Sequence, residues 1–395
     1  MAAAAAIGGF VLVRGSDDAG RATSAEPLPD PTRDWLRRAQ LLLKESDPLP
    51  VPEKIREAIG LLAKAESLSP TSADVAFWRG MACVMAKDRP AAQVAIHDVR
   101  ERSPRGDQDA RVHYLQAMSM LAFAEPPLDA LKQTRIARSL APRWMPELVD
   151  LATCRALKRV AIDLLDTNKP DQAIQALKEA VGLVRQNPTE VLEMRRLLVQ
   201  GYGRAARFLE AEEEAKALLT ERRENLDVAE FHLLYAQTLL EQKKWEAAAP
   251  EYSEVLRLLA AHRVPISDAW RLEIARLRLG DCLRYTGHVE DGVREVEAYV
   301  AAHPEDARGH YVLGEVCFDA LDEPERAIAA WERARSLAPW CEEPLMALLR
   351  VYEVAKHDPA KAKALKDEIE SGKEARRKER ARQAALHSDG SLVCG

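Results

Sequence analysis

The chain contains glycines, histidines and cysteines of the kinds that cofactor and metal sites use. Residues 201–206, Gly-Tyr-Gly-Arg-Ala-Ala, match the GxGxxA pattern that brings backbone amides close to the pyrophosphate of a dinucleotide. That pattern functions between a strand and the start of a helix, whereas here a helical sequence precedes it. The surrounding sequence therefore argues against a dinucleotide site. The chain also has no Walker A loop, HExxH, GxSxG or EF-hand loop.

Histidine and cysteine are the usual nitrogen and sulfur ligands of zinc, but here neither has the spacing of a metal site. The nine histidines are scattered, and even His303 and His310, which flank a turn, are expected to be solvated. The six cysteines lie far apart and form no CxxC pair: Cys83, Cys154, Cys282, Cys317, Cys341 and Cys394. We expect most of them to be small apolar residues in helix interfaces, and Cys394, in a polar tail, to be reactive. We therefore predict no metal, no cofactor and no catalytic residue.

The composition indicates which elements must position the remaining residues. Hydrophobic residues make up 47% of the 395 positions and charged residues 30%, whereas aromatic residues make up only 5%. Small apolar residues, Leu, Glu, Lys and Arg favour helices, and sheets mostly avoid this mixture. The apolar content is also too high for a mostly disordered chain. A net charge of −6 gives no overall basic field that would attract nucleic acid.

The first 32 residues differ from the rest of the chain. Residues 2–13 are an uncharged apolar run that ends at Arg14, and as a helix they would span about 18 Å of a bilayer core of about 30 Å. The run is therefore too short to cross a membrane. Two interpretations of residues 1–14 remain: a truncated signal or membrane anchor, or a disordered leader. Residues 15–32, rich in Gly, Ser, Asp and Pro, are predicted to be a flexible linker.

Small residues recur twelve positions apart through the following 310 residues. The pairs are Gly80 and Ala92, Ala161 and Ala173, Ala236 and Ala248, and Gly280 and Gly292, with Gly314 and Ala327 thirteen apart. A small residue on each helix of a hairpin allows the two backbones to approach closely where the helices cross. The stretch 277–304 shows this pattern best, with a turn at Gly287 and a stop at Pro304.

This pattern resembles the tetratricopeptide repeat, a helical hairpin of 34 residues with small residues at its eighth and twentieth positions. The resemblance implies an all-α fold, a right-handed superhelical solenoid of about eight hairpins within residues 33–342. Residues 343–386 are expected to form a degenerate repeat and a basic capping helix, and 387–395 a disordered tail. The predicted hairpins span about 33–70, 73–104, 111–142, 154–188, 192–223, 229–260, 273–304 and 307–339.

The resemblance also implies that partner peptides lie along a concave face made by the first helix of each hairpin. Transferred to this chain, the family's binding positions begin with an apolar stripe: Phe77, Met81, Val84, Met85, Leu115 and Phe123. A basic middle follows, with Arg155, Lys158, Arg196 and Arg204, and then an acidic and aromatic end: Glu230, Asp281, Arg284, Tyr285, Tyr311, Glu315 and Asp319. The apolar stripe has two interpretations, an open groove for hydrophobic anchors or a surface already covered by the linker or by neighbouring helices. The Lys and Asn set with which chaperone-binding members hold a C-terminal carboxylate is absent.

These observations predict a non-catalytic scaffold that binds a peptide or helix of a protein partner in the concave groove. It would be membrane-tethered in an envelope or multiprotein complex if the leader is an anchor. The alternative is a cytoplasmic regulatory or recruiting subunit of a separately encoded enzyme or signalling complex. The run 373–382 carries six basic and two acidic residues, and we interpret it as a solvated last helix rather than a nucleic-acid site. The Ala, Arg and Leu bias suggests a bacterial source.

Overall fold

The structure is a computed structural model that describes residues 29–46, 50–221, 228–261 and 269–386. The predicted leader 1–14, most of the linker 15–32, the tail 387–395 and Cys394 lie outside these residues. The described part of the chain folds into eighteen α-helices and one short 3₁₀ turn, and it contains no strand. The predicted all-α fold is therefore confirmed.

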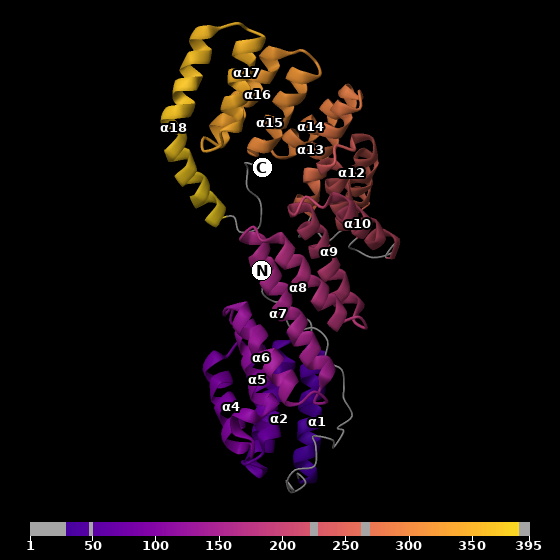
Figure 1. Cartoon of the computed structure of the whole chain (residues 1–395), viewed down its shortest axis with the longest axis vertical. Helices are drawn as coiled ribbons and strands as arrows, with labels where there is room; N and C mark the ends of the chain where they lie inside the picture. The colour runs from indigo at the N-terminus through magenta and orange to yellow at the C-terminus, as the bar shows by residue number, and fades with distance from the viewer. Residues whose placement is uncertain (1–28, 47–49, 222–227, 262–268, 387–395) are drawn as a thin grey trace. The chain divides into compact units, whose positions relative to one another are not determined.

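The chain divides into two compact units, and the boundary along the sequence lies between Arg207 and Phe208. Figure 1 labels their helices. The first unit contains α1 (Asp30–Glu45), α2 (Pro52–Leu68), α3 (Ala73–Met85), α4 (Arg89–Arg102), the 3₁₀ turn Gly106–Gln108, α5 (Ala110–Ala122), α6 (Pro127–Leu140), α7 (Pro146–Asp166), α8 (Pro170–Leu183) and α9 (Pro188–Arg204). The second contains α10 (Phe208–Glu221), α11 (Val228–Glu241), α12 (Trp245–Ala260), α13 (Ala269–Tyr285), α14 (Val289–Ala302), α15 (Ala307–Asp319), α16 (Pro324–Leu337), α17 (Glu343–Val354) and α18 (Pro359–Leu386).

Both units are solenoids of stacked helical hairpins. Within the first unit α1 packs on α2, α3 on α4, α5 on α6 and α7 on α8. Within the second, α11 packs on α12, α13 on α14, α15 on α16 and α17 on α18. The first helix of a hairpin also contacts the first helix of the next, as α3 does with α5 and α13 with α15. First helices thus form one layer of each stack.

Seven of these hairpins, all except α1–α2, have a turn with a common backbone conformation. Shortly after the first helix one residue takes a positive φ, at Lys87, Ala124, Asn168, Lys243, Gly287, Asp322 and His357, and Ala206 does the same after α9. In most of these turns the next residue donates its N–H back to a carbonyl five residues earlier, such as Asp88 to Cys83 at 2.9 Å and His288 to Leu283 at 2.9 Å. These bonds satisfy carbonyl groups that the end of a helix leaves without a partner. Only one of the eight residues is glycine, so the turns depend on this bonding rather than on glycine alone.

The predicted close approach of two helices occurs at Gly280 and Gly292. A Cβ atom on Gly280 would overlap the Val296 side chain and lie 3.2 Å from the carbonyl oxygen of Gly292. A Cβ on Gly292 would lie 2.9 Å from the carbonyl oxygen of Gly280. The two backbones therefore touch where α13 crosses α14, and a side chain at either position would separate them.

The core lies between the helices of neighbouring hairpins. Trp331 and Tyr252 are its largest fully buried side chains in the second unit, and Phe77 is the largest in the first. Cys83, Cys154, Cys282 and Cys317 are free and buried, in agreement with the expectation that cysteines fill helix interfaces. Burial raises the pKa of both Cys154 and Cys282 to about 12. No helix in the described part of the chain is both long enough and apolar enough to span a bilayer.

Candidate partner-binding surface

The first helices of three successive hairpins in the second unit form one continuous surface. Its residues on each helix are four positions apart and therefore lie on one helical face. They are Asp281 and Tyr285 with the adjacent Arg284 on α13, Tyr311, Glu315 and Asp319 on α15, and Met346, Arg350 and Val354 on α17. Asp281, Glu315 and Arg350 occupy equivalent positions, 34 and 35 residues apart. We call these nine residues the α13–α15–α17 surface.

Two arginines link the three helices through Asp319. The Arg284 guanidinium on α13 donates to Asp319 at 2.7 Å, and its side chain is 9% exposed. Arg350 on α17 lies 3.5 Å from the same carboxylate and donates to Glu315 at 3.2 Å. These bonds fix the order and spacing of charges along the surface, because each arginine is held by groups from a neighbouring helix.

Burial shifts the ionisation of the groups between these arginines. It raises the pKa of Asp281, and the nearby Arg284 and Arg278 offset the shift only in part. Burial likewise raises the pKa of Glu315 against the opposing charge of Arg350. The pKa of Tyr311 rises to about 12, first because of burial and then because of the charge of Glu315. Burial therefore disfavours the ionised form of both carboxyl groups, although an arginine lies beside each of them.

Exposed apolar side chains flank this charged centre. Tyr285 is 53% exposed, Met346 50% and Val354 62%. The Tyr285 ring stacks on Trp245 with a centroid distance of 4.3 Å, and the Arg284 guanidinium lies 4.4 Å from the tyrosine ring centre. Tyr285 is thus held in place while half of its surface remains open. This combination of a fixed aromatic ring, flexible apolar residues and charge suits contact with another polypeptide.

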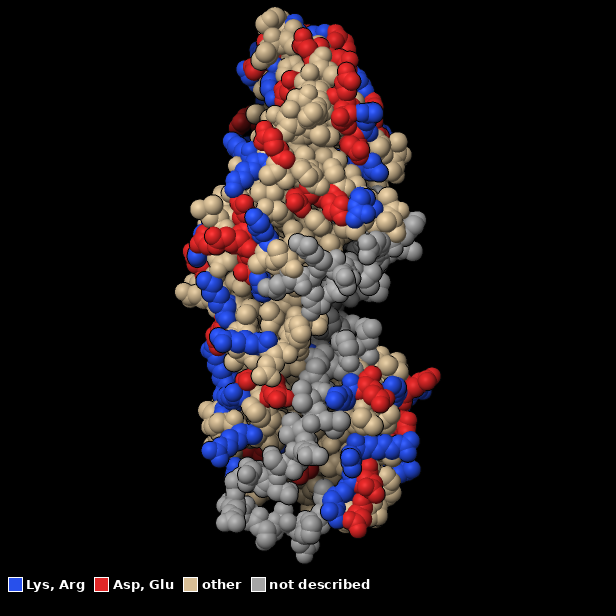
Figure 2. All heavy atoms as spheres, turned by 90° about the vertical axis from the view of Figure 1, so that its right-hand side faces the viewer, with Lys and Arg blue, Asp and Glu red and all other residues tan. Residues whose placement is uncertain are grey.

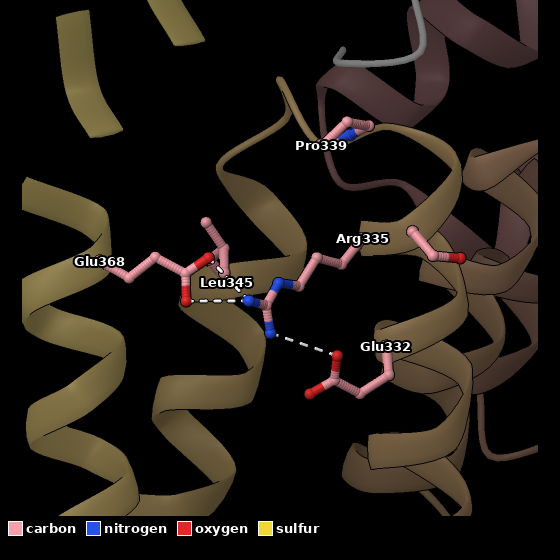
Figure 3. A pocket seen from close by; sticks show the side chains of 6 residues that line it. Glu332, Arg335, Pro339, Leu345 and Glu368 are labelled. Carbon is pink, nitrogen blue, oxygen red and sulfur yellow. Dashed lines mark hydrogen bonds and ion pairs between the residues drawn. The ribbon is translucent and has the colours of Figure 1, made fainter. Parts of the chain in front are cut away.

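A small cavity of about 320 Å³ lies elsewhere in the second unit, between α16, α17 and α18 (Figure 3). Arg335 crosses it and donates to both oxygens of Glu368, at 2.7 and 2.9 Å, and to Glu332 at 3.3 Å. The charges that line the cavity therefore satisfy one another. We interpret this cavity as part of the contact between α16 and α18 and not as a binding site.

The predicted apolar stripe of the first unit is not an open groove. Five of its six residues are buried: Phe77, Met81, Val84, Met85 and Leu115. The Phe77 ring packs edge-on against Trp144, with centroids 5.6 Å apart, and lies 6.0 Å from Tyr114. The expectation of an exposed stripe is therefore not met, and packing against neighbouring segments is the interpretation that holds. Phe123, the sixth residue, is half-buried with Arg89 5.8 Å from its ring centre.

The predicted basic middle consists of cations that are already engaged. Arg155 donates to Glu190 at 3.2 Å in a buried pair, and Lys158 donates to Glu193 at 2.8 Å. Arg204 donates to the carbonyl oxygen of Leu165 at 2.5 Å. Arg196 is half-buried on α9. Basic and acidic side chains are also interspersed on the face of the molecule that Figure 2 shows. The basic middle thus links α7 to α9 and is not a free anion-binding stripe.

The glycine pattern at residues 201–206 lies at the end of α9, where Gly201 is buried. A Cβ at Gly201 would lie 3.2 Å from Ile174, so this glycine serves helix packing. The His310 ring contacts the carbonyl oxygen of Pro304 at 2.9 Å, and the His303 ring lies 4.7 Å from the Tyr299 ring. Among the described residues no three His, Cys, Asp or Glu side chains gather as a metal site would require.

Comparison with known proteins agrees with this architecture. A family model for the tetratricopeptide repeat matches residues 277–339, which contain most of α13 and all of α14, α15 and α16. This part of the chain is similar to the tetratricopeptide repeat. This family is built from protein–protein interaction modules and is generally non-catalytic. The match falls on the part of the chain that contains two of the three helices of the α13–α15–α17 surface.

Several solved structures are similar to this chain at low sequence identity. The apo form of RapI superposes with a TM-score of 0.58 and 10% identity, over 87% of this chain and 99% of that one. The C-terminal part of a repeat protein from Cytophaga hutchinsonii gives a TM-score of 0.47 and 14% identity, over 79% of this chain and 99% of the other. The Cut9-Hcn1 hetero-tetramer of the APC/C gives 0.44 and 14%, and this chain spans 55% of that one. A comparison with curated proteins returned no match.

The structure brings together the acidic and aromatic residues that the repeat register places on α13 and α15. It adds three residues that the sequence analysis missed, Met346, Arg350 and Val354, because no binding positions were transferred to the degenerate repeat expected within residues 343–386. A signal for them was present: they follow Tyr311, Glu315 and Asp319 by 35 positions each. Trp245, which stacks on Tyr285, was also missed, since it belongs to a second helix and has no counterpart in the repeat pattern.

Proposed function

We propose that this chain is a protein–protein interaction scaffold that binds a polypeptide segment of its partner on the α13–α15–α17 surface. The observation that carries the proposal is the exposure of Tyr285, Met346 and Val354 around a charged centre that arginines hold rigid. The buried stripe around Phe77 offers no comparable surface. Aromatic residues, methionine and arginine are enriched at protein interfaces, and this surface contains Tyr285, Met346 and Arg350.

A pull-down with the full chain tests the proposal. The variant Tyr285→Ala/Met346→Ala removes two exposed apolar side chains from the surface. The control Leu68→Ala/Leu128→Ala removes two side chains of similar exposure, 50% and 58%, from α2 and α6. We expect wild type and control to retain the same partner and the surface variant to lose it. Calorimetry with the purified partner should then show a loss of about tenfold or more in affinity.

Equal retention by the surface variant and by wild type would place the interaction elsewhere and overturn the proposal. Circular dichroism must first show that all three proteins are equally helical. A subunit that recruits a separately encoded enzyme would use the same surface, and the identity of the retained partner distinguishes that role from a purely structural scaffold. Membrane tethering depends on residues 1–14, which lie outside the described residues, and remains a prediction.

A further inference from the structure

Cys341 differs from the other cysteines in the described part of the chain. Four of those are free and buried: Cys83, Cys154, Cys282 and Cys317. Cys341, in the turn before α17, is 3% exposed and takes part in a disulfide bond. The chain has six cysteines, and the sixth is Cys394, which lies outside the described residues. Within one chain, the cysteine that remains as a partner for Cys341 is therefore Cys394.

The course of α18 brings the chain back to the start of α17. α18 is a single helix of 28 residues that packs against the 12-residue α17 (Figure 1). Near the start of α18, Lys361 lies 4.7 Å from the ring centre of Tyr352, which is near the end of α17. Further along α18, Arg380 lies 4.0 Å from Glu343, which follows Cys341 by two positions. The two helices are therefore antiparallel, and α18 passes the start of α17 before it ends.

The sequence after α18 is long enough to return to Cys341. From Arg380 to its last residue, Leu386, α18 extends by about 9 Å. Cys394 follows Leu386 by eight positions, and an extended chain of this length spans up to about 28 Å. The segment 387–394 can therefore retrace the end of α18 and reach the start of α17.

Apolar packing holds only the first half of α18 on α17. Ala362 and Leu365 are buried in the core that the two helices share. No residue of α18 is buried from 366 to 382. A partly exposed ion pair, such as that of Arg380 with Glu343, contributes little to stability. A covalent bond beyond the end of the helix would supply the attachment that packing does not.

We propose that Cys394 and Cys341 form a redox-sensitive disulfide that fastens the end of α18 to the start of α17. The segment 387–393 is the strap between the helix and the bond. Reduction releases the strap, and the second half of α18 then separates from α17 more readily. α17 also carries three residues of the α13–α15–α17 surface, so the bond stabilises a helix on which these residues lie.

Formation of the bond needs an oxidant, and a small disulfide such as oxidised glutathione can serve. The Cys394 thiolate attacks one sulfur of this oxidant, forms a mixed disulfide and releases one thiolate. Cys341 reacts second, because it is buried and such exchange depends on access. Its thiolate attacks the Cys394 sulfur, closes the internal bond and releases the second thiolate. The two cysteines together lose two protons and two electrons, and the oxidant is reduced to two thiols.

Peptide mapping of the full chain tests the pairing. The protein is incubated with oxidised glutathione, its free thiols are blocked with iodoacetamide, and it is digested with trypsin without a reductant. We expect peptide 336–350, which contains Cys341, to be joined to peptide 383–395, which contains Cys394, and the link to disappear on reduction. The variant Cys394→Ser should lose this link. The control Cys83→Ser, at a free cysteine, should retain it.

Hydrogen exchange tests the fastening. We expect the amides of 370–386 to exchange about tenfold or more slowly in oxidised wild type than in reduced wild type, because the bond suppresses local opening of the helix. In Cys394→Ser the oxidised and reduced samples should exchange at the same rate. This substitution leaves every described residue unchanged, so a difference from wild type reports on the bond and not on the core.

The outcomes that contradict the proposal are distinct. Alkylated Cys341 and Cys394 after oxidation, a bond from Cys394 to another cysteine, or a bond between two chains would overturn the pairing. Equal exchange of 370–386 in oxidised and reduced wild type would overturn the fastening. Neither measurement involves a partner, so the scaffold function proposed above stands or falls separately.

Discussion

The first helices of the two units carry different residues at related positions of the repeat, and the difference decides which region can bind a partner. On α3 and α5 the residues are Phe77, Met81 and Leu115, and all three are buried. On α13 and α15 they are charged or aromatic, they are only partly buried, and their charges are paired with one another. Apolar side chains lower the free energy by packing together, whereas charged groups are costly to bury without partners. An apolar stripe in a repeat sequence is thus a weak indicator of a groove.

Among the substitutions that test this comparison, removal of the Phe77 side chain should change the free energy of unfolding most. We expect Phe77→Ala to lower the free energy of unfolding by about 3–5 kcal/mol, because the ring is buried against Trp78, Tyr114 and Trp144. The matched change Tyr285→Ala in the second unit should cost less, about 1 kcal/mol, because that side chain is half exposed and stacks only on Trp245. Guanidinium unfolding, with hydrogen exchange to assign each transition to its unit, measures both. A small effect at Phe77 would restore the interpretation of the stripe as an open surface.

A smaller loss is expected at the contact between α13 and α14. Gly280→Leu should cost about 1–3 kcal/mol, since even a Cβ at this position meets Val296 and the backbone of Gly292. Gly60→Leu is the control, because Gly60 lies in α2 with no atom within 4 Å of an added Cβ. There the substitution should stabilise the helix by up to about 1 kcal/mol. Equal melting behaviour of the two variants would contradict the assigned repeat register.

The sequence predicted the fold well because the fold depends on local patterns. Helical spacing, small residues at Gly280 and Gly292 and stop signals such as Pro304 all act within one hairpin. The surface was predicted only in part. Whether Phe77 faces solvent depends on Trp144, which lies 67 positions away and outside the repeat pattern. Tertiary packing of this kind leaves no periodic pattern in the sequence. The repeat register therefore predicted on which helix and at which position a side chain lies, but not whether it is exposed.

One acidic capping device is common to both units and gives a pH test. Asp109 and Asp306 each precede a first helix, and each accepts hydrogen bonds from the backbone and guanidinium of an arginine two residues later. A hydroxyl from the preceding segment also donates at 2.6 Å, from Ser103 in the first case and Tyr299 in the second. Burial alone would raise the pKa of both carboxyl groups, but these bonds lower it below the usual range.

The sign of the pH effect follows from this lowered pKa. At a pH above the pKa that an aspartate has in the unfolded chain, the ionised carboxylate stabilises the fold. This stabilisation is lost as the pH falls through the lower pKa that the group has in the folded protein. We expect Asp109→Asn and Asp306→Asn each to cost about 1–2 kcal/mol at neutral pH and progressively less in acid. Thermal melts at several pH values measure the difference. If the loss of stability in these variants did not change with pH, the hydrogen-bond geometry and not the negative charge would account for the effect of the cap.

Asp281 should respond in the opposite direction, and this is the smallest effect. Burial raises its pKa, so ionisation in the folded state is penalised above the unfolded pKa and the penalty disappears in acid, where the group is protonated in both states. Asp281→Asn should therefore stabilise the free protein slightly at neutral pH, by no more than about 1 kcal/mol, and have no effect at low pH.

The same melts that measure the Asp109 and Asp306 variants provide the comparison for Asp281. The Asp281 carboxylate lowers the stability of the free protein, whereas the carboxylates of Asp109 and Asp306 raise it. A destabilising charge is expected of a group with a role in binding and not of one that maintains the fold. If Asp281→Asn instead destabilised the chain at neutral pH, its carboxylate would be structural like those of the caps. Its role would then be to hold Arg278 and Arg284 in place and not to contact a partner.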